Sequence, residues 1–129
     1  MFGSKTILIA DGSTYAALDL SEAVEDSQGC VAGPVDTLSE AMTILDSGNV
    51  AGAIVDCELP NAAALIMRLT ESGVPLVVQT SIPLPQALEC MDDRLHVLMR
   101  PIDARTVIDA LELEIGKAAP QRPQVRLRS

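Results

Sequence analysis

Four polar side chains, Asp11, Asp56, Thr80 and Arg100, could act together chemically, because each stands where a short apolar run stops. Two carboxylates, a hydroxyl and a cation suit phosphoryl transfer. A carboxylate can be the nucleophile and form an aspartyl phosphate, and such transfer depends mostly on positioning and charge neutralisation. A second carboxylate helps to hold Mg²⁺, while a hydroxyl and a cation can cover the remaining phosphoryl oxygens.

Asp56 ends the most informative run, which extends from Ala51 to Asp56 and is followed by a turn at Pro60. A continuous apolar run is what a central parallel strand needs, because both of its faces are covered. An acid at the end of that run would lie at the carboxyl edge of the sheet, where α/β proteins keep their sites. We therefore predict that Asp56 is the functional centre.

The remaining apolar runs predict four further strands and the helices between them. The predicted strands cover residues 5–10, 30–34, 75–79 and 95–99, and the Gly and Pro of 30–34 suit an edge position. Helical spacing of apolar residues predicts helices over about 14–27, 38–46, 62–72 and 104–115, with a short one begun by Pro85 in the irregular segment 81–94.

Capping residues mark the ends of these helices. Ser13, Asn61 and Asp103 are expected to cap helix starts, and the pair Thr37 and Glu40 forms a capping box. Gly73 is expected just past one helix end, and Gly116 at the end of the last helix and of the predicted domain.

Alternating strands and helices predict an α/β fold, with a five-stranded parallel sheet covered on both faces by five helices and joined by right-handed crossovers. Because parallel strands point the same way, the four polar side chains should gather at one edge. We predict one domain over residues 1–116 and a basic tail, disordered or loosely attached, over residues 117–129.

Composition excludes several classes of protein. A net charge of −9 argues against direct nucleic-acid binding, and 2% aromatic residues argue against stacking of bases or flavins. No apolar run approaches the ~20 residues of a membrane span, and no signal peptide precedes the first strand. Three widely spaced cysteines, Cys30, Cys57 and Cys90, suggest buried thiols in a reducing cytoplasm.

The chain resembles the response-regulator receiver family of two-component signalling over residues 5 to about 116. The resemblance rests on four motifs, which are Ile-Leu-Ile-Ala-Asp11, Ile-Val-Asp56-Cys-Glu-Leu-Pro60, Val-Val-Gln-Thr80-Ser81 and Arg100-Pro101. The stretches 19–24 and 33–41 look most like single-domain receivers of alphaproteobacterial stress and light signalling. The family implies the flavodoxin-like strand order 2-1-3-4-5.

The resemblance also implies the roles of the site residues. Asp56 would accept a phosphoryl group from a histidine kinase or a histidine phosphotransfer protein, and Thr80 would be the switch hydroxyl. Asp11, Asp56 and the backbone carbonyl of Glu58 would bind Mg²⁺. Arg100 would supply the cation, and its bond to Pro101 is a candidate cis peptide. The protein would be a cytoplasmic signalling protein and not an enzyme.

Three residues depart from the family pattern. Gly12 replaces a second acid that usually binds Mg²⁺ directly, so the ion should be bound more weakly. Arg100 replaces a lysine and presents a planar fork instead of a point charge. Val97 stands where an aromatic rotamer switch is usual, and neighbouring His96 is not expected to be catalytic.

These departures leave two alternatives beside phosphorylation at Asp56. A pseudo-receiver would keep the fold as a phosphorylation-independent protein-binding module. A flavodoxin-like cofactor binder would hold phosphate at Gly12-Ser13-Thr14 at a helix N-terminus. In either signalling reading the output is expected through another protein, by contact with the surface 84–115, or through drainage of phosphoryl groups from a shared kinase.

Overall fold

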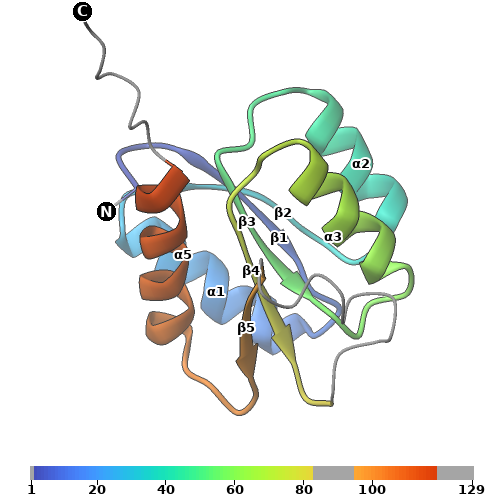
Figure 1. Cartoon of the computed structure of the whole chain (residues 1–129). Helices are drawn as coiled ribbons and strands as arrows, with labels where there is room; N and C mark the ends of the chain where they lie inside the picture. The colour runs from blue at the N-terminus through green and yellow to red at the C-terminus, as the bar shows by residue number, and fades with distance from the viewer. Residues whose placement is uncertain (1, 83–94, 119–129) are drawn as a thin grey trace, which may run out of the picture.

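A computed structural model describes residues 2–82 and 95–118 of the chain. Five strands and four helices lie in these residues and alternate along most of the sequence (Figure 1). In chain order they are β1 (Thr6–Ala10), α1 (Thr14–Asp26), β2 (Cys30–Val35), α2 (Leu38–Asp46), β3 (Gly52–Asp56), α3 (Ala62–Glu71), β4 (Leu76–Thr80), β5 (His96–Met99) and α5 (Ala104–Ala118).

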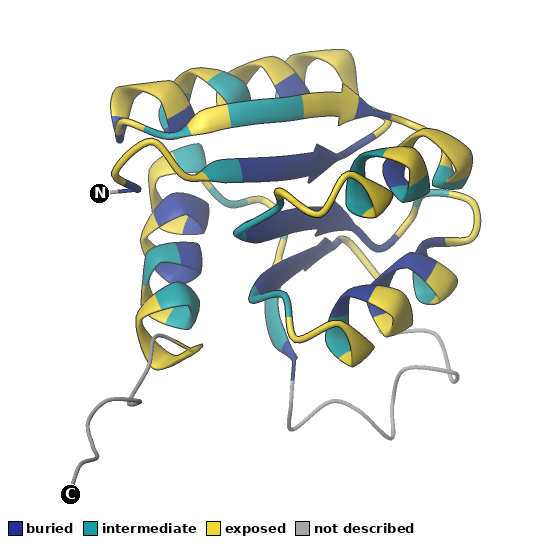
Figure 2. Cartoon of the chain, turned by 90° about the horizontal axis from the view of Figure 1, so that it is seen from above, coloured by how far each residue is buried: buried dark blue, intermediate teal, exposed yellow. Residues whose placement is uncertain are grey.

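The strands form one parallel sheet in the order β2-β1-β3-β4-β5, which confirms the predicted fold class and strand order. Every residue of β3 and β4 is buried, as a central strand requires. β2 lies at the edge and contains the cis peptide Gly33–Pro34, so its predicted edge position is also confirmed. Figure 2 shows the buried strands enclosed by helices whose outer faces are exposed.

Two apolar layers pack against the sheet, one on each face. Successive side chains of a strand point to opposite faces. In β1, Ile7 and Ile9 therefore join the layer under α1 and α5, while Leu8 and Ala10 join the layer under α2 and α3. Figure 1 shows these two helix pairs on opposite sides of the sheet. The polar ends of the strands are left at one rim, between the two layers.

The helix ends agree with the sequence at some positions and differ at others. The Ser13 hydroxyl accepts the Ala16 N–H at 3.4 Å, and Thr37 accepts the Glu40 N–H at 3.2 Å. The Asn61 side chain makes no capping bond, so that prediction is wrong; its φ of 65° shows that the position needs a residue that tolerates left-handed backbone.

Gly116 was expected at the end of the last helix, and this is also wrong. The helix α5 runs on to Ala118, and Gly116 is an ordinary helical position. Gly73 does follow α3, with a φ of +74° that suits glycine. Gly73 and Gly116 differ in backbone conformation: Gly73 is left-handed and follows a helix end, whereas Gly116 has no positive φ and lies within the helix.

Some predictions fall outside the described residues. These are the short helix from Pro85, the position of Cys90 and residues 119–129 of the predicted tail. The tail was expected to begin at Lys117, but Lys117 and Ala118 belong to α5, so its predicted start is wrong. The cis peptide Arg100–Pro101 lies within the described residues and is confirmed. In the described ranges, no helix is long and apolar enough to cross a membrane.

We expect the core layer under α3 to be intolerant of truncation. Ile66 is fully buried there, and its helix neighbour Met67 is 42% exposed. Ile66→Ala should lower the free energy of unfolding by about 2–5 kcal/mol, because it leaves a cavity. Met67→Ala, the matched control, should change it by less than about 0.5 kcal/mol. Urea unfolding followed by circular dichroism measures both; equal effects would contradict the assigned faces of α3.

Candidate functional site

The carboxyl ends of four strands bring the predicted polar residues to one rim of the sheet. Asp11 follows β1, Asp56 ends β3, Thr80 ends β4 and Arg100 follows β5. The backbone N–H of Arg100 donates to the Thr80 carbonyl at 2.9 Å, which extends the β4–β5 pairing by one residue. The backbone position from which the Arg100 side chain extends is therefore fixed by its hydrogen bond to β4.

Arg100 lies at the centre of this rim. One guanidinium nitrogen, Nη1, donates to Asp56 Oδ1 at 3.1 Å and to Glu58 Oε2 at 3.4 Å. The other, Nη2, donates to Asp11 Oδ2 at 3.2 Å and to Gln79 Oε1 at 3.3 Å. We call these five residues the Arg100 cluster. A planar fork can bridge two carboxylates in this way, which a single ammonium group cannot do with the same geometry.

Asp56 presents its two oxygens differently. Its Oδ1 accepts the backbone N–H of Glu58 at 2.9 Å as well as the Arg100 contact. For Oδ2, the described part of the chain provides no hydrogen bond. The side chain is 11% exposed at the rim. Oδ1 is thus held by two donors, whereas Oδ2 has none among the described residues.

Asp11 is the most enclosed acid of the cluster, with 1% of its side chain exposed. Its Oδ1 accepts the Ser13 N–H at 2.8 Å, and its Oδ2 contacts Arg100. Burial raises the pKa of Asp11, and the neighbouring Asp56 charge adds to this; the Ser13 hydrogen bond and Arg100 oppose the shift without cancelling it. The charged form of Asp11 is therefore less favoured than that of an aspartate in water.

Thr80 reaches the same rim but is not part of the Arg100 cluster. Its hydroxyl donates to the Ile82 carbonyl at 2.6 Å and accepts the Ile82 N–H at 3.2 Å. The side chain is fully buried. Gln79 and Thr80 are consecutive in β4, so they point to opposite faces of the sheet. That alternation places Gln79 with Arg100 and turns Thr80 away.

Sequence reasoning missed the side chains of Gln79 and Glu58. The signal for Gln79 was present, because an amide inside an otherwise apolar strand must find a partner when buried. Glu58 was expected to contribute only its backbone carbonyl. Its carboxylate instead contacts Arg100 and accepts the Ser81 N–H at 2.7 Å, which links the turn after β3 to the turn after β4.

The predicted Mg²⁺ ligands do not form an open metal site in this arrangement. Asp11 and Asp56 are brought together as expected, but the Arg100 guanidinium lies on an oxygen of each. Within residues 2–82 and 95–118, no group of three or more His, Cys, Asp or Glu side chains is arranged to hold a metal ion. The residues as placed therefore fit a guanidinium and not a divalent ion.

His96 and Val97 lie apart from the Arg100 cluster. His96 Nδ1 is 2.8 Å from Glu114 Oε2, which ties β5 to α5. Burial acts to raise the pKa of Glu114, but hydrogen bonds from His96 and Lys117 outweigh it, so the pKa is lowered. Val97 packs, half-buried, in the layer under α2 and α3. Neither residue approaches Asp56 in a way that would suit catalysis.

The cysteines divide into two environments. Cys57 is buried beside the site, and burial raises the pKa of its thiol, with the Asp56 and Glu58 charges adding to the effect. A thiol held protonated is a poor nucleophile. Cys30 is exposed on the edge strand, so the expectation that it is buried was wrong; the outer side of an edge strand lacks a covering helix at that point.

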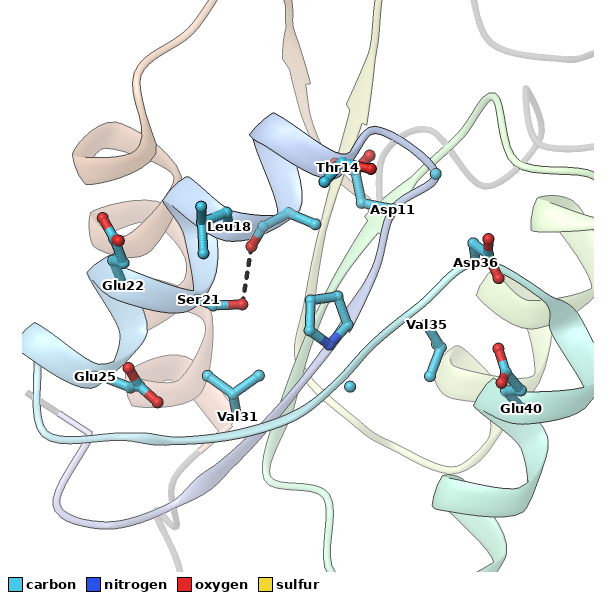
Figure 3. A pocket seen from close by; sticks show the side chains of 14 residues that line it. Asp11, Thr14, Leu18, Ser21, Glu22, Glu25, Val31, Val35, Asp36 and Glu40 are labelled. Atoms are coloured by element: carbon cyan, nitrogen blue, oxygen red, sulfur yellow. Dashed lines mark hydrogen bonds between the residues drawn. The ribbon is translucent and has the colours of Figure 1, made fainter.

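A groove of about 830 Å³ lies between α1, β2 and the start of α2 (Figure 3). It touches the Arg100 cluster only through Asp11. Its size would suit a small ligand, but acids line it, including Glu22, Glu25, Asp36 and Glu40. The Ser13 N–H at the start of α1 is already bonded to Asp11. This environment repels phosphate and disfavours a flavodoxin-like cofactor binder.

Several solved structures resemble this chain over nearly its whole length. A response regulator receiver protein from Sinorhizobium medicae gives a TM-score of 0.73 at 22% identity, covering 92% of this chain and 99% of that one. A CheY-like receiver domain from Methanospirillum hungatei gives 0.73 at 14% identity, covering 89% and 97%. A response regulator from Thermotoga maritima gives 0.71 at 18% identity, covering 88% and 98%.

The chain has the receiver fold. At these identities the likeness shows the fold and does not transfer the activity of the neighbours. No protein-family model matches the sequence. No curated protein sequence matches it either. In this fold Asp56 lies at the carboxyl end of the central strand, β3.

We expect Asp11→Asn to stabilise the protein at pH 7. Because the pKa of Asp11 is raised in the folded protein, protonated Asp11 favours the folded state at a pH below the unfolded pKa. This contribution to the free energy of unfolding is lost as the pH rises through the folded pKa. Removing the charge should add about 0.5–2 kcal/mol at pH 7 and almost nothing near pH 3. Urea unfolding across this pH range measures the difference. The exposed Asp109→Asn is the control, and a loss of stability in Asp11→Asn at pH 7 would contradict the assignment.

Proposed function

We propose that this protein is a response-regulator-like signalling protein that accepts a phosphoryl group on Asp56. One observation carries the proposal: Asp56 ends the central strand with Oδ1 held by Glu58 N–H and Arg100, while Oδ2 has no hydrogen bond from the described residues. A carboxylate with one oxygen fixed and a lone pair of the other not engaged by a donor is oriented for attack on an incoming electrophile.

In the proposed step, Asp56 Oδ2 attacks the phosphorus of a phosphohistidine on the donor protein. The new P–O bond forms as the P–N bond breaks, and the electron pair of that bond stays with the imidazole nitrogen. Arg100 contacts Asp56 and can follow the transferred group, so that its charge offsets the negative phosphoryl oxygens. Thr80, fully buried beside Ile82, would change partner only after the transfer.

We propose that the protein acts in the cytoplasm and that its donor is a histidine kinase or a histidine phosphotransfer protein. Output would pass to another protein through the surface 84–115, or consist of draining phosphoryl groups from a shared kinase. Of that surface, the part from residue 95 onward is described, and it exposes Met99 and Leu113, each by more than half. The role is that of a signalling protein and not of an enzyme.

A second candidate function is a phosphorylation-independent binding module. The observation that favours it is the ion pairing of Arg100 with Asp11 and Asp56. A site whose charges are already paired does not need a phosphoryl group or a metal to remain stable. In this reading the receiver fold presents a constant surface to its partner.

Transfer of label separates the two functions. The full chain is incubated with a ³²P-labelled histidine phosphotransfer protein, and separately with phosphoramidate, each with MgCl₂ or with EDTA. We expect one alkali-labile, hydroxylamine-sensitive phosphoryl group on the wild type and none on Asp56→Asn, because only the carboxylate can form the acyl phosphate. The exposed Asp26→Asn should label normally. A wild type that carries no label in any of the four conditions would contradict phosphorylation at Asp56 and favour the phosphorylation-independent binding module.

A further inference from the structure

The position of the Arg100 guanidinium points to a role beyond the contact with Asp56. Its two terminal nitrogens divide between carboxylates from two strands, Asp56 of β3 at 3.1 Å and Asp11 after β1 at 3.2 Å. Glu58 adds a third carboxylate at 3.4 Å. Because the backbone of Arg100 continues the β4–β5 pairing, this bridge is built into the sheet.

The charges at the rim require a cation. Asp11 and Asp56 have 1% and 11% of their side chains exposed, so water screens them poorly. Three carboxylates face one guanidinium, and within the described residues the Arg100 cluster contains no second positive group. Arg100 therefore supplies the charge that keeps two buried acids close together.

A divalent ion cannot use the same oxygens at the same time. Mg²⁺ needs oxygen ligands at about 2.0–2.1 Å in octahedral geometry, and the guanidinium already contacts Asp56 Oδ1 and Asp11 Oδ2. An ion between these oxygens would overlap Arg100 and repel its like charge. An ion could bridge these two oxygens only if Arg100 left them.

Gly12 adds a second reason. A carboxylate at this position would lie beside Asp11 and could hold an ion against Arg100. Glycine is not required there by the backbone, because its φ is outside the left-handed region, and an added Cβ would meet only the flexible end of Leu59 at 3.2 Å. The glycine thus removes a potential ligand without serving the turn.

We propose that Arg100 is the built-in cation of this site: it takes the place of a divalent ion between Asp11 and Asp56 and excludes Mg²⁺ from the wild-type protein. The exclusion of Mg²⁺ can be tested without phosphoryl transfer. Its consequence for signalling rests on the proposed function: phosphoryl transfer to Asp56 would proceed equally in MgCl₂ and in EDTA.

Titration with MgCl₂, without any phosphoryl donor, tests this directly on the full chain. The thermal midpoint and the heat of binding are measured for the wild type and Arg100→Ala, against KCl of equal ionic strength. Arg100→Gln, which keeps a polar side chain without the charge, replaces Arg100→Ala if the latter does not fold. Arg68→Ala is the matched control, since it removes an exposed arginine from Asp46 far from the rim.

We expect no saturable Mg²⁺ effect on the wild type or on Arg68→Ala. The Arg100 variant should gain saturable binding, with a midpoint raised by roughly 5 °C at a Mg²⁺ concentration ten times the dissociation constant. Adding Asp56→Asn to it should abolish the gain. Saturable binding by the wild type would overturn the proposal, and so would an Arg100 variant that binds no Mg²⁺. Neither result depends on whether Asp56 accepts a phosphoryl group.

Discussion

The ion pairing of Arg100 with Asp11 and Asp56 is the constraint on which the rest of the site depends. Two acids at adjacent strand ends, both nearly buried, would repel each other without a cation between them. The guanidinium offsets that repulsion, and its fork reaches both strands at once. Removing the guanidinium from this group leaves two uncompensated, nearly buried carboxylates, which is strongly unfavourable.

The sheet makes this pairing possible by bringing distant residues to one rim. Asp11 and Arg100 are separated by 89 positions in the sequence, yet their side chains are 3.2 Å apart. Parallel strand direction puts all the strand ends on one side, and the apolar layers on both faces hold the strands in register. Chemistry at the rim and burial in the core are therefore consequences of the same alternation of apolar residues.

Alternation along a strand then decides which polar residues meet. Gln79 and Thr80 are neighbours in β4, but one reaches Arg100 and the other bonds to Ile82. Under the proposed function this separates the acceptor Asp56 from the switch hydroxyl until a phosphoryl group connects them. Under the binding-module alternative, the same separation leaves the two faces of the rim independent.

Much of the fold could be predicted from the sequence, because it depends on local patterns. The apolar runs that became β3 and β4 are continuous, and the helix α3 buries Ala62, Leu65, Ile66 and Leu69 at helical spacing. Predictions were wrong where a residue type serves two purposes. Asn61 occupies a position with left-handed backbone and makes no side-chain capping bond. Gly116 lies inside α5, which continues to Ala118.

The sequence by itself determined the strands, the rim and the identity of Asp11, Asp56, Thr80 and Arg100, because periodicity and strand direction follow from residue type and order. The strand order was an expectation from the family resemblance, and the sheet pairing confirms it. Only the tertiary structure decided that Arg100 lies on both acids, that Glu58 and Gln79 join it, and that Thr80 does not. Those contacts depend on side-chain direction and on distances between separate strands. A linear pattern fixes which residues reach an edge of the sheet, but not which of their atoms touch.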